Sequence, residues 1–302
     1  MTPPLPSAPP TEASDAPVHI GAVGLVVRDL ERLTAYYRDV LGLTVLERTA
    51  QAAALGVDGI TLLVLSHRPD ALPDDPRDAG LYHTAFLMPT RADLARWIVH
   101  ASRMRVPITG ASDHDVSEAI YLDDPEGNGI EVYSDRPRRM WRRDGKTIFQ
   151  KTDPLDIDAI LGEIDPATAT YPGAPAGLRI GHIHLRVGNI AAAEAFYCGV
   201  LGLDVTRRRT GATFISSGGY HHHVGVNVWH SEGAGVRTGT RAGLDWFALD
   251  VIDQPALDDL RMRLGAAGVK IDRIPGGFCA ADPSGIRIRF TVSQTAGSPA
   301  SA

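Results

Sequence analysis

The chain contains one long stretch twice, and this duplication strongly limits the folds that it can adopt. Residues 21–45 (GAVGLVVRDLERLTAYYRDVLGLTV) return 160 positions later as residues 181–205 (GHIHLRVGNIAAAEAFYCGVLGLDV). The second copy has His182 where the first has Ala22. A repeat at this distance indicates a duplicated structural unit. The change at one potential ligand position indicates that the two copies divided their roles after the duplication.

Each copy divides again into two modules, so four modules are predicted, at about 18–68, 81–135, 179–230 and 243–292. In the first module we expect a strand over 22–27 and then a helix. Asp29 is a favoured N-cap residue, and Gly42 suits the position just after the helix, where positive φ is common. The helix carries one apolar stripe at spacings of three and four residues, formed by Leu30, Leu33, Tyr37 and Leu41. Short strands are predicted at 44–49 and 61–66.

The second module repeats this order, with a strand at 82–88, a helix at 92–104 and strands at 118–122 and 129–133. Its last two strands enclose the turn Asp-Pro-Glu-Gly at 124–127, and the fourth module has a similar turn, Asp-Pro-Ser-Gly, at 282–285. We therefore predict an α+β protein made of four βαβββ modules. These form two paired-module domains, 18–135 and 179–292, whose mixed sheets curl around a cleft.

Three segments lie outside the modules. Residues 1–17 and 293–302 are rich in Pro, Ala and Ser, which bury little surface, and both are predicted to be disordered. Residues 136–178 are predicted to be a linker between the domains. The linker begins with a run of arginines, which we expect to be solvated. The alternative is that they form a rim around a pocket and steer anions toward it. The run consists of Arg136, Arg138, Arg139, Arg142 and Arg143.

Composition excludes several classes of protein. The net charge of −6 argues against a nucleic-acid binder, which needs a basic face. The apolar runs are much shorter than the roughly 20 residues that cross a bilayer, so no membrane association is expected. No basic and then apolar leader opens the sequence, and two cysteines make no disulfide framework. We expect a cytoplasmic protein, and a pairwise-modular fold is compatible with assembly into a homo-oligomer.

The chain resembles the vicinal oxygen chelate superfamily, which includes glyoxalases, bleomycin-resistance proteins and dioxygenases. The resemblance rests on the module order and on the signature Tyr-x-x-Val-Leu-Gly-Leu, present at 37–43 and 197–203. It implies that two modules close their sheets around a shared cleft. The signature itself identifies the fold and leaves the reaction open.

The resemblance also implies where metal ligands lie: near the start of the first strand of a module and on its last strand. The second module has His83 and Glu131 at these positions, and the third has His182. The other two modules have Ala22, Trp246 and Arg289 instead. Neither half holds a full set, so we infer that the two inner modules share one site, within a chain or across a dimer. Two histidines and one carboxylate form the facial triad typical of non-haem Fe(II), and the set also accepts Mn(II).

An ordinary structural role is the alternative for each of these residues. A single histidine on a strand is more often a core or surface residue than a ligand. Glu131 is harder to explain in this way, because it stands between Ile130 and Val132 on a predicted strand. A carboxylate directed into a sheet concavity is costly without a partner. The coincidence of all three residues at matching module positions favours the ligand hypothesis.

Further residues match the extradiol catechol dioxygenases of this superfamily. Three histidines at 221–223 precede a predicted strand at 224–229. In those enzymes this strand begins with a histidine that acts as acid and base, which implies a catalytic role for His223. His222 is the second choice for that role and is otherwise expected to contact the substrate. The family also places a histidine and then a tyrosine in the stretch that corresponds to residues 112–121 of the second module, which implies catalytic roles for His114 and Tyr121. A loop histidine and an ordinary strand aromatic are the alternatives for these two.

Together these features predict an extradiol ring-cleaving dioxygenase that opens a catechol-type aromatic diol with O₂. A glyoxalase-like metal-dependent isomerase or lyase is the first alternative. A metal-free, drug-sequestering binding protein of the same fold is the second.

Overall fold

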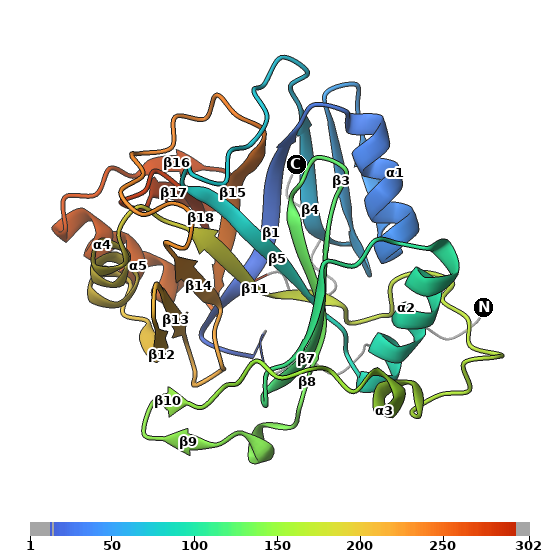
Figure 1. Cartoon of the computed structure of the whole chain (residues 1–302). Coiled ribbons are helices and arrows are strands. Elements are labelled where there is room, and N and C mark those ends of the chain that lie inside the picture. Colours follow the sequence, from blue (N-terminus) through green and yellow to red (C-terminus); the bar gives the residue numbers. More distant parts are fainter. Residues whose placement is uncertain (1–12, 14, 294–302) are drawn as a thin grey trace, which may run out of the picture.

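The computed structural model describes residue 13 and residues 15–293, and it contains all four predicted modules (Figure 1). The first comprises β1 (Val18–Val27), α1 (Leu30–Leu41), β2 (Thr44–Arg48), β3 (Ala52–Val57) and β4 (Ile60–His67). The second comprises β5 (Gly80–Leu87), α2 (Arg91–Met104), β6 (Gly110–Asp113), β7 (Ser117–Asp123) and β8 (Gly129–Asp135). The α+β class and the βαβββ order are confirmed, while the short strands β3 and β6 were missed in the sequence.

The third and fourth modules follow the same order. The third comprises β11 (Arg179–Arg186), α4 (Ile190–Glu194), the π-helical turn η2 (Ala195–Val200), β12 (Asp204–Arg209), β13 (Ala212–Ser216) and β14 (Val224–Asn227). The fourth comprises β15 (Gly243–Val251), α5 (Gln254–Ala266), β16 (Asp272–Ile274), β17 (Gly277–Ala281) and β18 (Arg287–Val292).

The modules form two eight-stranded mixed sheets, and each sheet joins modules from both halves of the chain (Figure 1). The inner sheet has the order β12-β13-β14-β11-β5-β8-β7-β6 and thus combines the second and third modules. The outer sheet has the order β16-β17-β18-β15-β1-β4-β3-β2 and combines the first and fourth. In both sheets the first strands of two modules pair antiparallel at the centre, β5 with β11 and β1 with β15.

The α1 helix begins and ends where the sequence predicts. The Asp29 carboxylate accepts a hydrogen bond from the backbone N–H of Arg32 at 3.0 Å, as an N-cap does. Gly42 ends the helix at φ 74°, and an added Cβ there would come within 2.4 Å of the Ala174 nitrogen. The predicted apolar stripe of the helix is buried in a core that both sheets share.

The signature tyrosines connect the first module to the second and the third module to the fourth. The Tyr37 hydroxyl donates to Asp124 at 2.9 Å, and the Tyr197 hydroxyl donates to Asp282 at 3.1 Å. Each of these buried aspartates opens an Asp-Pro turn of the following module. The Tyr signature and the turns were noticed separately in the sequence, and this hydrogen bond explains why both recur.

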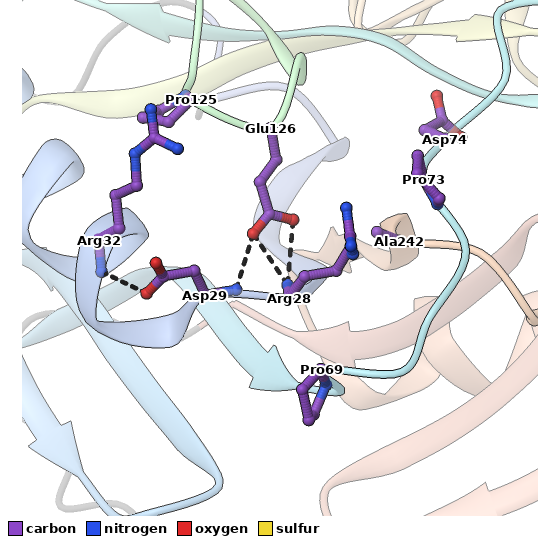
Figure 2. A pocket seen from close by; sticks show the side chains of 9 residues that line it. All are labelled: Arg28, Asp29, Arg32, Pro69, Pro73, Asp74, Pro125, Glu126 and Ala242. Carbon is purple, nitrogen blue, oxygen red and sulfur yellow. Dashed lines mark hydrogen bonds between the residues drawn. The ribbon is translucent and has the colours of Figure 1, made fainter.

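The turn of the second module also docks on the start of α1 (Figure 2). The Glu126 carboxylate accepts from the backbone N–H groups of Arg28 and Asp29 at 2.8–3.0 Å. It lies in a surface hollow of about 420 Å³ whose walls include Arg32, Pro73 and Asp74. The carboxylate therefore already takes the place that an anion would occupy at this helix start.

The segment 136–178 is folded on the first three modules, with contacts to each of them. It contains η1 (Arg138–Met140), β9 (Arg143–Asp144), β10 (Thr147–Ile148) and α3 (Ile157–Leu161). Arg136 pairs with Asp113 at 2.5 Å and with the buried Glu118 at 3.0 Å, and Ile148 is fully buried. The expectation of a solvated arginine run is therefore wrong for Arg136, because two carboxylates of the second module bind it, the buried Glu118 and the partly buried Asp113.

The predictions of disorder fall mostly outside the described residues, which exclude 1–12, 14 and 294–302. Ala13 and Ala16, within the predicted disordered segment, are buried. Among the described helices, none has the length and apolar character that crossing a membrane requires.

Replacing Tyr37 with Phe should lower the free energy of unfolding by about 1–2 kcal/mol, because the buried Asp124 loses a hydrogen-bond donor. Urea unfolding of the variant measures this loss. Tyr36→Phe is the matched control, since Tyr36 is only partly buried and donates to a backbone carbonyl, and its effect should stay below about 0.5 kcal/mol. Equal effects of the two substitutions would contradict the role given to the Tyr37–Asp124 bond.

Candidate metal centre

The register of the inner sheet brings three predicted ligands to one point. His182 on β11 pairs with Ala85 on β5, and Ala85 pairs with Glu131 on β8. Paired residues direct their side chains to the same face of a sheet. Because Ala85 carries only a methyl group, the longer side chains on either side can meet above it. His83 lies two residues before Ala85 on β5 and therefore shares this face.

The side chains of His83, Glu131 and His182 converge as predicted. Glu131 Oε2 lies 3.0 Å from His83 Nε2 and 3.0 Å from His182 Nε2. One donor atom from each residue lies within 4.8 Å of the other two. The three side chains are at most 9% exposed, so they form a largely buried cluster, which we call the His-His-Glu cluster.

The donor set fits a divalent metal ion. His83 Nε2 is buried and has no hydrogen-bond partner among the described residues, although the carboxylate lies close to it. Two ligand atoms that each lie about 2.1 Å from an ion, with a right angle between them at the ion, are about 3 Å apart. The distances from Glu131 Oε2 to the Nε2 atoms of His83 and His182 match this value. The chemistry is that of a facial triad, two imidazoles and one carboxylate.

The charge state of the cluster suits ligation. Burial lowers the pKa of His182 to about 4, so its imidazole is neutral at neutral pH, as a ligand must be. Burial alone would raise the pKa of Glu131, but His182 and His83 outweigh this effect and hold the pKa well below its usual range. The cluster thus presents an ionised carboxylate beside a neutral imidazole.

His114 and Tyr121 lie together beside the cluster. Tyr121 on β7 pairs with Glu131 on β8, and its ring centre lies 5.6 Å from that of His83. His114 Nδ1 is 2.8 Å from the Lys151 carbonyl, and its Nε2 is 2.6 Å from the Tyr121 hydroxyl. A carbonyl can only accept, so Nδ1 carries the proton and Nε2 of the neutral ring accepts from Tyr121. The segment 136–178 thus orients His114 through Lys151.

The side chains of His222 and His223 have different surroundings. The His222 ring lies 4.1 Å from the ring of His182 and 5.0 Å from that of Phe214. His223 faces elsewhere: its Nε2 lies 3.0 Å from the carbonyl of Ala13, and its Nδ1 accepts from the Ser217 N–H at 3.2 Å. The structure therefore brings His222, but not His223, to the cluster.

His184 also belongs to this face and was not predicted from the sequence. It pairs with His83 across β5 and β11, with ring centres 5.1 Å apart, and its Nε2 is buried without a partner among the described residues. Burial lowers the pKa of His184 well below its ordinary value. The alternation His182-Ile183-His184 on a predicted strand is the signal that could have shown that both imidazoles share one face.

A second group of donor atoms adjoins the first. One ring nitrogen from each of His182, His221 and His222 lies within 4.8 Å of the others. This group has no carboxylate, and the Nδ1 atoms of His221 and His222 are 2.7 Å apart and share a hydrogen bond. The His-His-Glu cluster is therefore the better candidate for a metal ion.

The outer sheet keeps the framework of this site but not its ligands. Trp246 pairs with Gly24, as His83 pairs with His184, and a Cβ on Gly24 would come within 2.3 Å of the indole. The guanidinium carbon of Arg289 lies 3.7 Å from the centre of the Trp246 ring, a cation–π contact. The indole and the guanidinium fill the space that a metal ion would need.

Comparisons with known proteins agree with this architecture. The model of the Glyoxalase/Bleomycin resistance protein/Dioxygenase superfamily matches residues 19–132 and 179–290. A catechol-2,3-dioxygenase of Bacillus subtilis is 40% identical over 284 residues, which are 91% of this chain and 97% of the relative. A biphenyl-2,3-diol 1,2-dioxygenase of Rhodococcus globerulus is 32% identical over 118 residues, 37% of this chain and 60% of the relative.

Solved structures show the same fold at lower identity. Glyoxalase I of Zea mays has a TM-score of 0.54 and 15% identity, and the match covers 93% of this chain and 94% of the maize chain. The family model covers both halves of the chain, and the catechol dioxygenase matches nearly its whole length. The chain therefore belongs to the glyoxalase/bleomycin resistance protein/dioxygenase superfamily.

Proposed function

We propose that this protein is an extradiol ring-cleaving dioxygenase that opens a catechol-type aromatic diol with O₂ at a non-haem Fe(II) ion. The observation that carries the proposal is the His-His-Glu cluster, whose donor set is the one that non-haem Fe(II) oxygenases use. The 40% identity to a catechol-2,3-dioxygenase over most of the chain supports the same reaction. Mn(II) is the alternative ion, since it accepts the same ligands.

His83, His182 and Glu131 would hold the ion. When bound, it would supply charge to lower the pKa of a diol hydroxyl and redox capacity for the reaction with O₂. The remaining steps belong to side chains of this chain, which bind the diol, orient it and move its protons.

Tyr121 and His114 would position the diol. Because the Tyr121 hydroxyl donates a hydrogen bond to His114 Nε2, its oxygen can accept a hydrogen bond from a substrate hydroxyl. The carbonyl of Lys151 holds the His114 ring in this orientation. Burial and the nearby Glu131 raise the pKa of Tyr121 well above its ordinary value, so Tyr121 stays protonated and keeps this arrangement at neutral pH.

His222 would contact the substrate and transfer protons. Among the three consecutive histidines it has the shortest ring separation from a ligand of the cluster, 4.1 Å to His182. Phe214 lies beside it, and His184 lies against Phe214, so both provide aromatic surface for a planar ring. We assign the acid–base role to His222 rather than to His223 on this geometry.

The reaction itself gives the first test. Protein reconstituted with Fe(II) without oxygen, then supplied with catechol and O₂, should consume O₂ and diol in equal amounts and form a yellow ring-opened product. Turnover of the methylglyoxal–thiol adduct without O₂ uptake would instead identify an isomerase. Binding of the diol without any turnover would identify a binding protein.

The ligand assignment predicts loss of metal. His83→Ala, His182→Ala and Glu131→Ala should each reduce bound iron from about one ion per chain to a small fraction, because one of three ligands is removed. Metal analysis after desalting measures this. His184→Asn is the matched control, since His184 shares the face and lacks a partner, and it should retain the ion. Iron retained in His83→Ala and lost in His184→Asn would contradict the assignment.

The histidine run allows a direct comparison of neighbours. His222→Gln should lower kcat roughly 10²- to 10⁴-fold with iron retained, as the loss of general acid–base catalysis does. His223→Gln should change kcat by less than about tenfold, because both nitrogens of His223 bind groups outside the cluster. A large loss of kcat in His223→Gln alone would restore the sequence-based assignment of His223.

A further inference from the structure

We propose that Asp135 and His221 are positioning residues that fix His222 in the tautomer whose Nε2 lone pair is free to take a proton. The inference rests on the proposed function for its consequence in catalysis, whereas the tautomer itself can be measured without any turnover. From the sequence, Asp135 had no assigned role, and His221 appeared only as a member of the histidine run.

A chain of short hydrogen bonds joins the three residues. Asp135, at the end of β8, has its Oδ1 atom 2.9 Å from His221 Nε2. His221 Nδ1 lies 2.7 Å from His222 Nδ1. His222 in turn packs on His182 of the His-His-Glu cluster. The chain therefore leads from the edge of β8 to the proposed proton-transfer group.

The polarity of this chain follows from its first member. A carboxylate can only accept, so His221 Nε2 carries a hydrogen and donates to Asp135. In the neutral ring, His221 Nδ1 then has a lone pair and accepts from His222 Nδ1–H. His222 Nε2 is left as the unprotonated nitrogen. This tautomer is the one that can accept a proton from a diol hydroxyl at Nε2.

The surroundings hold the middle imidazole in place. His221 is fully buried, and its ring centre lies 4.0 Å from that of Tyr220 and 5.3 Å from that of Trp141. Trp141 belongs to the segment 136–178, and its indole N–H donates to the Arg136 carbonyl at 2.7 Å. Tyr220 donates to the other oxygen of Asp135 at 2.8 Å. Both the carboxylate and the His221 ring are thus fixed from two sides.

The arrangement is comparable to other carboxylate–histidine pairs in which the acid selects the tautomer of a working imidazole. Here a second imidazole stands between them. The third histidine of the run, His223, has no part in the chain, since its nitrogens bind Ala13, Ser216 and Ser217. The run of three histidines therefore contains one positioning residue, one proposed proton-transfer residue and one residue bound elsewhere.

The test combines spectroscopy with kinetics. Nitrogen-15 NMR of histidine-labelled, Zn(II)-substituted full-length protein should show His222, assigned by comparison with His222→Gln, as the Nδ1–H tautomer. In His221→Phe this tautomer should be lost. The Fe(II) form of that variant should lose roughly 10- to 100-fold in kcat with KM and metal content unchanged. Asp135→Asn, which leaves the core intact, should give a mixture of tautomers and an intermediate kcat.

Tyr220→Phe is the matched control. It removes the second hydrogen bond of Asp135 but keeps the ring stacking and the Asp135–His221–His222 chain, so the Nδ1–H tautomer of His222 should persist and kcat should fall less than in Asp135→Asn. An Nε2–H tautomer of His222 in the parent protein would overturn the proposal. Unchanged kcat in both His221→Phe and Asp135→Asn, or loss of bound metal together with kcat, would overturn it too. If the unsubstituted protein is inactive but His222 has the Nδ1–H tautomer, the proposed function is refuted and the tautomer assignment stands.

Discussion

The antiparallel pairing of β5 with β11 is the contact on which the site depends. It joins the second module to the third and puts His182 and Glu131 on either side of Ala85, about fifty residues apart in sequence. A one-residue slip of this register would turn the ligands of one strand to the opposite face. The small side chain of Ala85 leaves the space above the sheet in which the imidazoles and the carboxylate meet.

The same framework occurs twice, and the two sheets carry different kinds of side chain at the equivalent positions. In the inner sheet, buried polar groups face one another, and among the described residues Nε2 of His83 has no hydrogen-bond partner, although the Glu131 carboxylate lies 3.0 Å away. In the outer sheet, Trp246 and Arg289 satisfy each other through a cation–π contact. Duplication of a module pair thus allowed one sheet to keep polar ligands while the other filled its equivalent space with side chains.

Much of this architecture was predictable from the sequence, because it depends on local patterns. Asp29 and Gly42 mark the ends of α1, and the repeat aligns His182 with Ala22. The direction of side chains within the histidine run was not predictable, because the run precedes β14 and no flanking pattern sets its register. The packing of 136–178 was also missed, since Arg136 binds carboxylates that are distant in sequence.

The central claim is that one ion lies between His83, His182 and Glu131. A crystal of the protein grown with Fe(II) in the absence of oxygen, measured with X-rays on both sides of the iron absorption edge, tests it most directly. We expect a single anomalous peak at about 2.0–2.3 Å from His83 Nε2, His182 Nε2 and a Glu131 carboxylate oxygen. A peak among His182, His221 and His222, or no peak near Glu131 at full iron occupancy, would contradict the account.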